Sequence, residues 1–221
     1  VGHLKMSFLL EELGYRLKDD DRFKLYLTNT LEMEELPPQT RMPTVASLSE
    51  ESHLADKIKK QQPILVILGN PPYSVSSANR SDSFEAEMKL YKEDVRDEKN
   101  IQPLSDDYIK FIRFAHWKID KGGMGVIGMI TNNSYLSGLI HRGMRKKLLE
   151  SFNEIYILNL HGNSRIGEKC PDGSKDENVF DIQQGVSVAL FIKERNQKGL
   201  GKIFYHDIYG LREQKYDYLA N

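Results

Sequence analysis

The sequence predicts an α/β fold. Residues 64–68 form a continuous apolar run, Ile-Leu-Val-Ile-Leu, which is typical of a strand buried on both faces of a parallel sheet. Apolar residues at helical spacing over 108–119 predict a helix, and further strands are expected at 125–131 and 154–160. Strands that alternate with helices in this way indicate an α/β sheet.

The remaining elements follow from the same patterns. Helices are expected near 1–13, 49–60, 84–91 and 141–152, and strands near 23–28, 185–193 and 202–208. Only a loop separates the strands at 154–160 and 185–193, so we expect them to pair antiparallel at one edge of the sheet. Residues 32–62 are interpreted as a proline-punctuated insertion, and residues 74–107 as a mobile surface loop that is partly helical.

Composition excludes several classes of protein. The 221 residues carry 31 Lys and Arg against 32 Asp and Glu, and this balance argues against a globally basic nucleic-acid-binding surface. The uninterrupted apolar run at 64–68 is far shorter than the roughly 20 apolar residues that a membrane-spanning helix needs, so no membrane partner is expected. Cys170 is the only cysteine, which excludes an intrachain disulfide and favours a cytoplasmic location. The histidines lack metal-ligand spacing, so no metal site is expected.

One glycine pattern has to be set aside. Residues 123–128, Gly-Met-Gly-Val-Ile-Gly, match the G-x-G-x-x-G pattern of a phosphate-binding loop. In such a loop the glycines follow a strand and open a helix, whereas here they follow a helix and lead into a strand. We therefore interpret them as a helix stop and a strand entry.

The most informative motif is Asn70-Pro71-Pro72-Tyr73, which comes directly after the strand at 64–68. Ligand sites of open α/β sheets lie at this end of the strands. The side-chain oxygen of Asn70 and the main-chain oxygen of Pro71 could accept the two hydrogens of a planar amino group, and the two prolines would keep the chain rigid. Tyr73 could stack on an extruded base.

The tetrapeptide after an apolar strand resembles motif IV of the amino methyltransferases, which use S-adenosylmethionine to alkylate the exocyclic nitrogen of adenine or cytosine, or the amide of glutamine. Residues 25–32, 108–115 and 179–187 resemble other segments of the large bacterial adenine methyltransferases of restriction-modification systems, including single-polypeptide restriction enzymes. The resemblance covers nearly the whole chain. It implies a Rossmann-like methyltransferase fold, S-adenosylmethionine as cofactor, and double-stranded DNA with a flipped adenine as substrate.

The resemblance also implies roles for single residues. Tyr73 and Phe180 would be the two aromatic plates that hold the flipped adenine. Tyr108 and Phe111 would line the pocket for the adenine of the cofactor, although aromatic stripes of this kind more often belong to a core. Asn29 could contact the cofactor or the base, and turn capping explains it equally well.

Four basic residues are candidates for contacts with DNA phosphates. Arg165 and Lys169 precede Phe180 in the sequence and would flank the base pocket. Arg142 and Arg145 lie on the expected helix at 141–152 and could also contact phosphates, but a solvated helix face explains them equally well.

Two elements of the family are missing from these 221 residues: the glycine-rich motif I and the acidic residue that holds the cofactor ribose. In the family order they precede residue 1, and a target-recognition domain follows residue 221. We therefore expect a catalytic fragment, inactive in isolation, that works with the remaining domains of a parent polypeptide. Two alternatives stay open: methylation of a glutamine amide, for which a second aromatic plate is not needed, and a non-catalytic module that only binds DNA.

Overall fold

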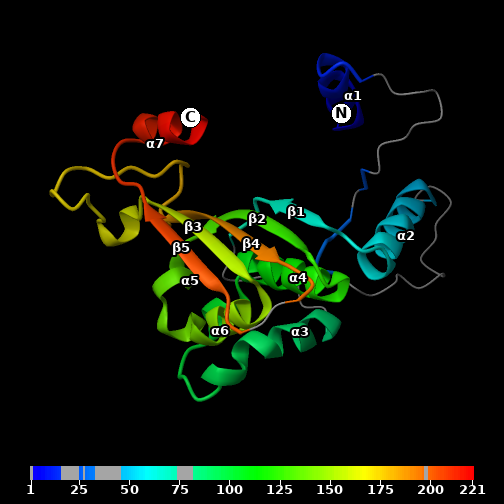
Figure 1. Cartoon of the computed structure of the whole chain (residues 1–221), viewed down its shortest axis with the longest axis horizontal. Helices are drawn as coiled ribbons and strands as arrows, with labels where there is room; N and C mark the ends of the chain where they lie inside the picture. Colours follow the sequence, from blue (N-terminus) through cyan, green and yellow to red (C-terminus); the bar gives the residue numbers. More distant parts are fainter. Residues whose placement is uncertain (1, 16–24, 27, 33–45, 74–81, 197–198) are drawn as a thin grey trace. The chain divides into compact units, whose positions relative to one another are not determined.

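The computed structural model describes residues 2–15, 25–26, 28–32, 46–73, 82–196 and 199–221. The chain divides into two compact units, Val1–Gln62 and Pro63–Asn221 (Figure 1). None of the described helices is long and apolar enough to cross a lipid bilayer.

The described residues of the first unit form two helices, α1 (Gly2–Glu12) and α2 (Ala46–Gln61). The second of these confirms the helix expected near 49–60. Lys59 of α2 binds the segment 28–32, since its ammonium group donates to the carbonyl oxygens of Asn29 and Glu32 at 3.1 and 2.8 Å. The strand expected at 23–28 is not formed at residues 25, 26 and 28, and its other residues lie outside the described part of the chain.

The second unit is built on a five-stranded sheet with the order β1-β2-β4-β3-β5 (Figure 1). Its strands are β1 (Val66–Gly69), β2 (Gly125–Asn132), β3 (Glu154–His161), β4 (Val186–Lys193) and β5 (Lys202–Asp207). β1 pairs parallel to β2, and β3 pairs parallel to β5, while β4 is antiparallel to both β2 and β3. Four strands therefore point in one direction and β4 points in the other, which confirms the α/β class.

The position of the reversed strand differs from the expectation. β3 and β4 pair antiparallel as predicted, but β4 lies between β2 and β3 and not at an edge. The physical reason is burial: Val186, Ala189 and Phe191 of β4 are almost completely buried, whereas every residue of β5 is exposed. The more apolar strand takes the inner position, and β5 takes the edge.

Helices cover one face of the sheet (Figure 1). They are α3 (Asp82–Lys92), α4 (Asp107–Gly122), α5 (Ser134–Ser137) and α6 (Arg142–Ser151). Ile127, Phe191 and Ile155 stand opposite one another on β2, β4 and β3, and all three are buried. This row of the sheet therefore forms the core beneath the helices.

Residues 82–92 form the helix α3, which confirms the helix expected near 84–91. Residues 93–107 contain two 3-10 turns and the start of α4, where the sequence predicted a mobile loop. Residues 74–81 lie outside the described part. Phe84, Met88 and Tyr91 of α3 are fully buried. Apolar residues at helical spacing outweigh the charged residues between them, and the segment becomes part of the core.

The glycines at 123–128 act as the sequence predicted. Gly123 adopts the left-handed conformation, with φ of 78°, and ends α4 by donating its N–H to the carbonyl oxygens of Ile119 and Asp120. Gly125 opens β2 next to the carbonyl oxygen of Leu65, which would lie 2.6 Å from an added Cβ. They are a helix stop and a strand entry, as interpreted above.

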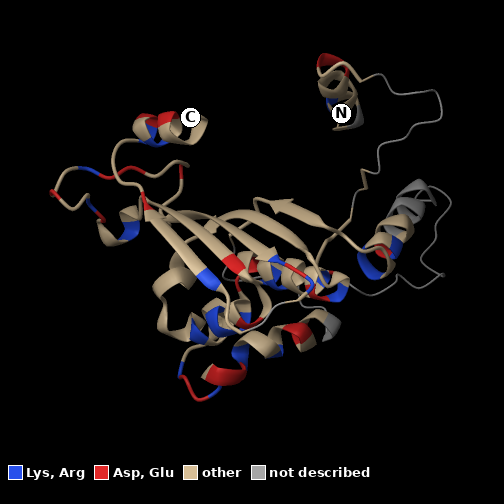
Figure 2. Cartoon of the chain, in the orientation of Figure 1, with Lys and Arg blue, Asp and Glu red and all other residues tan. Residues whose placement is uncertain are grey.

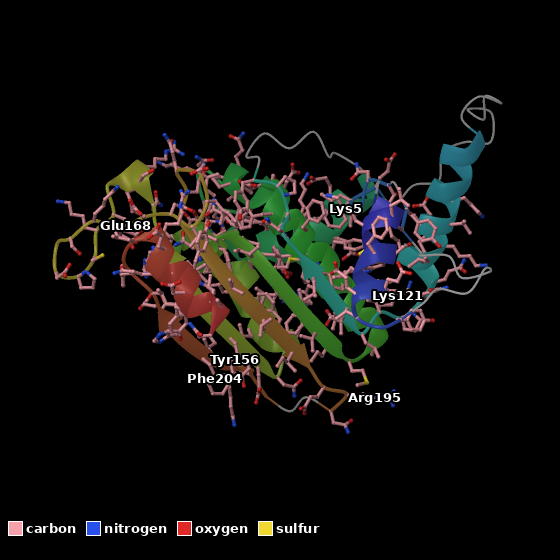
Figure 3. All side chains as sticks on the ribbon, turned by 90° about the horizontal axis from the view of Figure 1, so that it is seen from above. Lys5, Lys121, Tyr156, Glu168, Arg195 and Phe204 are labelled. Carbon is pink, nitrogen blue, oxygen red and sulfur yellow. The ribbon has the colours of Figure 1, made fainter. Side chains whose placement is uncertain are left out.

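On the other face of the sheet, the row next to Ile127, Phe191 and Ile155 is apolar and exposed. Leu68, Leu190, Tyr156 and Phe204 share this row by register, and between 38% and 76% of each residue is exposed. The rings of Tyr156 and Phe204 are stacked with their centroids 4.6 Å apart, and Figure 3 shows both on the sheet.

Candidate active site

The candidate site lies at the edge of the sheet where β1, β2, β3 and β5 end and β4 begins. Val186, the first residue of β4, is paired both with Asn132 at the end of β2 and with His161 at the end of β3. Asn70 follows the last residue of β1 and therefore stands at the same edge. Ligand sites of mostly parallel sheets occupy this edge.

The tetrapeptide 70–73 is anchored but open. Pro71 is buried, while Asn70 and Pro72 are exposed and Tyr73 is half-buried. Among the described residues, no hydrogen bond uses the side chain of Asn70 or the carbonyl oxygen of Pro71. Two acceptor oxygens on a stiff turn are thus available at an accessible sheet edge.

Three tyrosines lead from this turn into the core. The ring centroids of Tyr73 and Tyr108 are 6.2 Å apart, and those of Tyr108 and Tyr135 are 6.3 Å apart. Burial raises the pKa of Tyr73 to about 12 and the pKa of Tyr135 to about 12. These phenols stay protonated at neutral pH, so they offer rings and not bases.

The candidate cofactor residues occupy different environments. Tyr108 is only 2% exposed, since its ring is packed between Tyr73 and Tyr135, whereas Phe111 on the same helix is half-buried. Asn29 belongs to the first unit, where its side-chain oxygen accepts the N–H of Leu31 at 3.1 Å. This contact is the turn capping that the sequence left open for Asn29.

Phe180 lies in the long connection between β3 and β4. Its side chain packs against the buried residues Leu160, Val179 and Val186. It also lines a cavity of about 650 Å³ together with Gly162, Asn178, Ile182 and Arg212, among others. Among the described residues, Asn70 and Tyr73 do not line this cavity.

The four basic candidates divide into two pairs. Arg165 and Lys169 are exposed in the connection that carries Phe180. Arg142 instead forms an ion pair with Glu98 at 2.7 Å, and Arg145 donates to the carbonyl oxygens of Tyr135 and Gly138 at 2.7 and 2.8 Å. Figure 2 shows acidic residues beside the basic ones around these helices, which favours a structural role for Arg142 and Arg145.

Sequence reasoning missed a cluster around His161 at the same sheet edge. The two ring nitrogens of His161 lie 2.7 Å from Glu168 and 2.6 Å from Asp207, and the ring stacks on Tyr209 at 3.9 Å. His161 has φ of 50°, a conformation that L-residues rarely adopt. Nothing in the sequence identified His161 as the partner of Asp207.

Four strands thus run in one direction around a single reversed inner strand, and Asn-Pro-Pro-Tyr lies at their carboxyl edge, after a strand as in motif IV of the amino methyltransferases that the sequence resembles. Residues 4–166 match the family described as Eco57I restriction-modification methylase, and the chain belongs to this family. It is also similar to the Type II methyltransferase M.BanIII of Aneurinibacillus aneurinilyticus, with 29% identity over 105 residues, which are 48% of this chain and 16% of that protein. The resemblance inferred from the motifs is thereby confirmed.

Solved structures agree with this assignment. The ATP-dependent Type ISP restriction-modification enzyme LlaBIII bound to DNA is 35% identical, with a TM-score of 0.74 over 89% of this chain and 13% of that one. The DrdV–DNA complex is 27% identical, with a TM-score of 0.65 over 78% of this chain and 18% of that one. A nuclease-deletion mutant of LlaGI with a DNA substrate mimic shares the fold, at 24% identity and a TM-score of 0.78 over 99% of this chain and 18% of that one. The chain thus spans less than a fifth of each of these proteins.

Proposed function

We propose that this chain forms the acceptor side of a DNA methyltransferase site, where a methyl group passes from S-adenosylmethionine to the exocyclic amino group of adenine during restriction-modification. The observation that carries the proposal is the exposure of Asn70 on a proline-stiffened turn at the carboxyl edge of β1, in a chain of the Eco57I methylase family.

The chemistry needs two acceptors and no strong base. The side-chain oxygen of Asn70 and the carbonyl oxygen of Pro71 would accept the two N–H bonds of the adenine amino group and direct its electron pair outward. S-adenosylmethionine, when bound, supplies an electrophilic methyl group. Asn70 and Pro71 would hold the amino nitrogen with its electron pair towards that methyl group, and the surplus proton of the nitrogen would leave to water without a protein base.

The adenine must leave the duplex to reach Asn70, at a cost of a few kcal/mol. Tyr73 and Phe180 would stack on its two faces and offset this cost, and Arg165 and Lys169 would bind phosphates beside it. Phe111 is the more accessible candidate for the cofactor ring, while the buried Tyr108 would act by supporting Tyr73. Asn29 remains a candidate cofactor contact, and we expect the full natural polypeptide to be needed for transfer.

The test is methyl transfer by the full natural polypeptide, with labelled S-adenosylmethionine and duplexes that contain its methylation site. Asn70→Ala is expected to lower the rate by roughly 10²–10³-fold, as for the loss of one oriented charge-stabilising group. Tyr73→Ala is expected to lower both the rate and DNA affinity. Asn196→Ala is the matched control, since Asn196 is also exposed but follows β4 at the opposite edge of the sheet.

Unchanged transfer in both Asn70→Ala and Tyr73→Ala would refute the proposal. Transfer to a glutamine of a protein, with none to DNA, would favour the glutamine alternative. Tight DNA binding by a wild-type polypeptide that never methylates would favour the non-catalytic module.

A further inference from the structure

The helix α7 (Arg212–Ala220) holds the segment that carries Phe180. This segment belongs to the connection between β3 and β4, where the only helical turn in the described part is Ser164–Ile166. Its main chain therefore needs partners from elsewhere, and α7 provides them.

Side chains of α7 bind four consecutive carbonyl oxygens, those of residues 177–180. Lys215 donates to Glu177 at 2.6 Å, and Tyr216 donates to Val179 at 2.5 Å. Arg212 donates through Nε to Asn178 at 2.7 Å and through Nη2 to Phe180 at 3.0 Å. Arg212, Lys215 and Tyr216 have the i, i+3, i+4 spacing that places side chains on one face of a helix.

Lys215 fixes α7 itself. Its ammonium group is completely buried and meets the carbonyl oxygens of Leu160 and Glu177 and the carboxylate of Asp176, at 2.6–2.7 Å. Three donors thus find three acceptors. Asp176 in turn accepts the N–H groups of Gly162 and Gly210 at 2.6 and 2.8 Å, which ties the end of β3 to the start of α7.

Asn178 completes the arrangement from the other side. Its side-chain oxygen accepts the N–H of Phe180 at 2.9 Å, and its side-chain nitrogen donates to the carbonyl oxygens of Gly162 and Gln184 at 3.0 and 2.6 Å. Both the N–H and the carbonyl oxygen of Phe180 are therefore bound by side chains, and one of these comes from α7.

We propose that α7 is the positioning element for Phe180, with Arg212 and Tyr216 as positioning residues that hold its ring for stacking on an extruded base. This inference rests on the proposed function, in which Phe180 is the second aromatic plate. Arg212 and Tyr216 bind main-chain oxygens of this segment, and Arg212 also pairs with Asp181 at 2.7 Å, so in this proposal they act through the place they give to Phe180.

The experiment uses the full natural polypeptide and two duplexes. One carries 2-aminopurine at the target position, whose fluorescence rises when the base leaves the stack, and the other carries adenine there and reports the methylation rate. Arg212→Gln is expected to lower the fluorescence gain and the methylation rate by about tenfold, as for the loss of hydrogen bonds from a charged donor. Tyr216→Phe should lower both by a smaller factor. Tyr218→Phe is the control, since Tyr218 lies on the same helix but its ring stacks with His206.

A double-substitution cycle with Phe180→Ala separates positioning from general stability. If Arg212 acts through Phe180, Arg212→Gln adds nothing further in the Phe180→Ala background. Full additivity of the two losses, or an equal loss in Tyr218→Phe, would overturn the inference while leaving the proposed function intact. If Phe180→Ala itself changes neither signal, the role of Phe180 as a base plate fails, and the inference fails with it.

Discussion

The ring of Tyr108 meets the ring of Tyr73 edge-on, with the two planes at 87°. Edge-to-face pairs of this kind contribute about 0.5–1.5 kcal/mol beyond the area they bury. Tyr108 is itself held by Tyr135, so the orientation of the Tyr73 ring is set from within the core. The hydroxyl group of Tyr73 is buried and has no hydrogen-bond partner in the described part of the chain.

Tyr73→Phe is therefore expected to keep methyl transfer within about twofold of the wild type, because stacking needs the ring and the hydroxyl group makes no bond that would be lost. Tyr73→Leu, which removes the ring but keeps an apolar side chain, should behave like Tyr73→Ala. Initial rates with labelled cofactor measure both. A Tyr73→Phe variant as impaired as Tyr73→Leu would mean that the hydroxyl group takes part in the chemistry.

Lys215→Met is expected to destabilise the protein by about 3–5 kcal/mol, because it leaves the carboxylate of Asp176 buried without its cation. The effect should appear as a lower melting temperature and as faster hydrogen exchange in α7 and residues 160–180. Lys175→Met is the control, because Lys175 pairs with Glu177 in an exposed position and should cost less than about 1 kcal/mol. Equal losses of stability in the two variants would contradict a stabilising role for the buried ion pair of Lys215 and Asp176.

Gly162→Ala and Gly167→Ala form a matched pair. Both glycines have positive φ, 81° and 65°, but an added Cβ would lie 2.5 Å from the main chain of Asn178 at Gly162 and would contact nothing within 4 Å at Gly167. Gly167→Ala should cost about 1–2 kcal/mol from backbone strain alone. Gly162→Ala should cost clearly more in thermal unfolding and should also lower methylation, because Asn178 holds Phe180. Equal losses of stability in the two variants would show that the main chain near Asn178 moves easily to make room for the added Cβ.

His141 predicts a specific dependence of stability on pH. Burial and then the charge of Arg145 lower the pKa of His141 to about 4, whereas the pKa in the unfolded chain is near 6.5. The unfolded state therefore takes up the proton first, and stability falls as the pH drops from about 6.5 to about 4. The loss should approach roughly 3 kcal/mol. His141→Gln should flatten this part of the curve in denaturant titrations, and an unchanged slope would speak against a neutral buried imidazole.

Substitutions in the two pairs of basic residues, Arg165 with Lys169 and Arg142 with Arg145, should affect DNA binding differently. Arg165→Ala is expected to weaken binding and to reduce the slope of log affinity against log salt by about 1, the effect of one lost phosphate contact. Arg145→Ala should leave this slope unchanged and instead lower the melting temperature, because Arg145 binds the carbonyl oxygens of Tyr135 and Gly138. Fluorescence anisotropy over a series of salt concentrations measures both slopes. The reverse pattern would exchange their roles.

Local patterns were sufficient for most elements of the second unit and for the position of the tetrapeptide 70–73 directly after a strand. The strand before Asn70, the stripe of α4 and the stop at Gly123 depend on nearby residues, and each formed. The expected burial of that strand on both faces was wrong, because β1 lies at an edge of the sheet and Val66 and Leu68 are 58% and 76% exposed. The inner place of β4 did not follow, because strand order depends on contacts between distant segments. The burial of α3 was missed because its charged residues were given more weight than its apolar spacing.

The role of α7 could not be predicted for a different reason. Its contacts run from Arg212, Lys215 and Tyr216 to main-chain oxygens, and such contacts leave no apolar periodicity in the sequence. Every residue has a carbonyl group, so only the three-dimensional structure identifies the four that α7 binds. The cluster at His161 could not be predicted either, because its two carboxylate partners, Glu168 and Asp207, come from separate segments of the sequence.

The inner place of β4 also dictates an order of events during synthesis. β2 and β3 both leave the ribosome before the strand that must fit between them, so neither can complete its pairing until residue 193 has emerged. Until then each presents an open edge to other nascent chains. Premature pairing of β2 with β3 would exclude β4 from its place in the sheet, which is a kinetic trap of the kind that larger chains meet during folding.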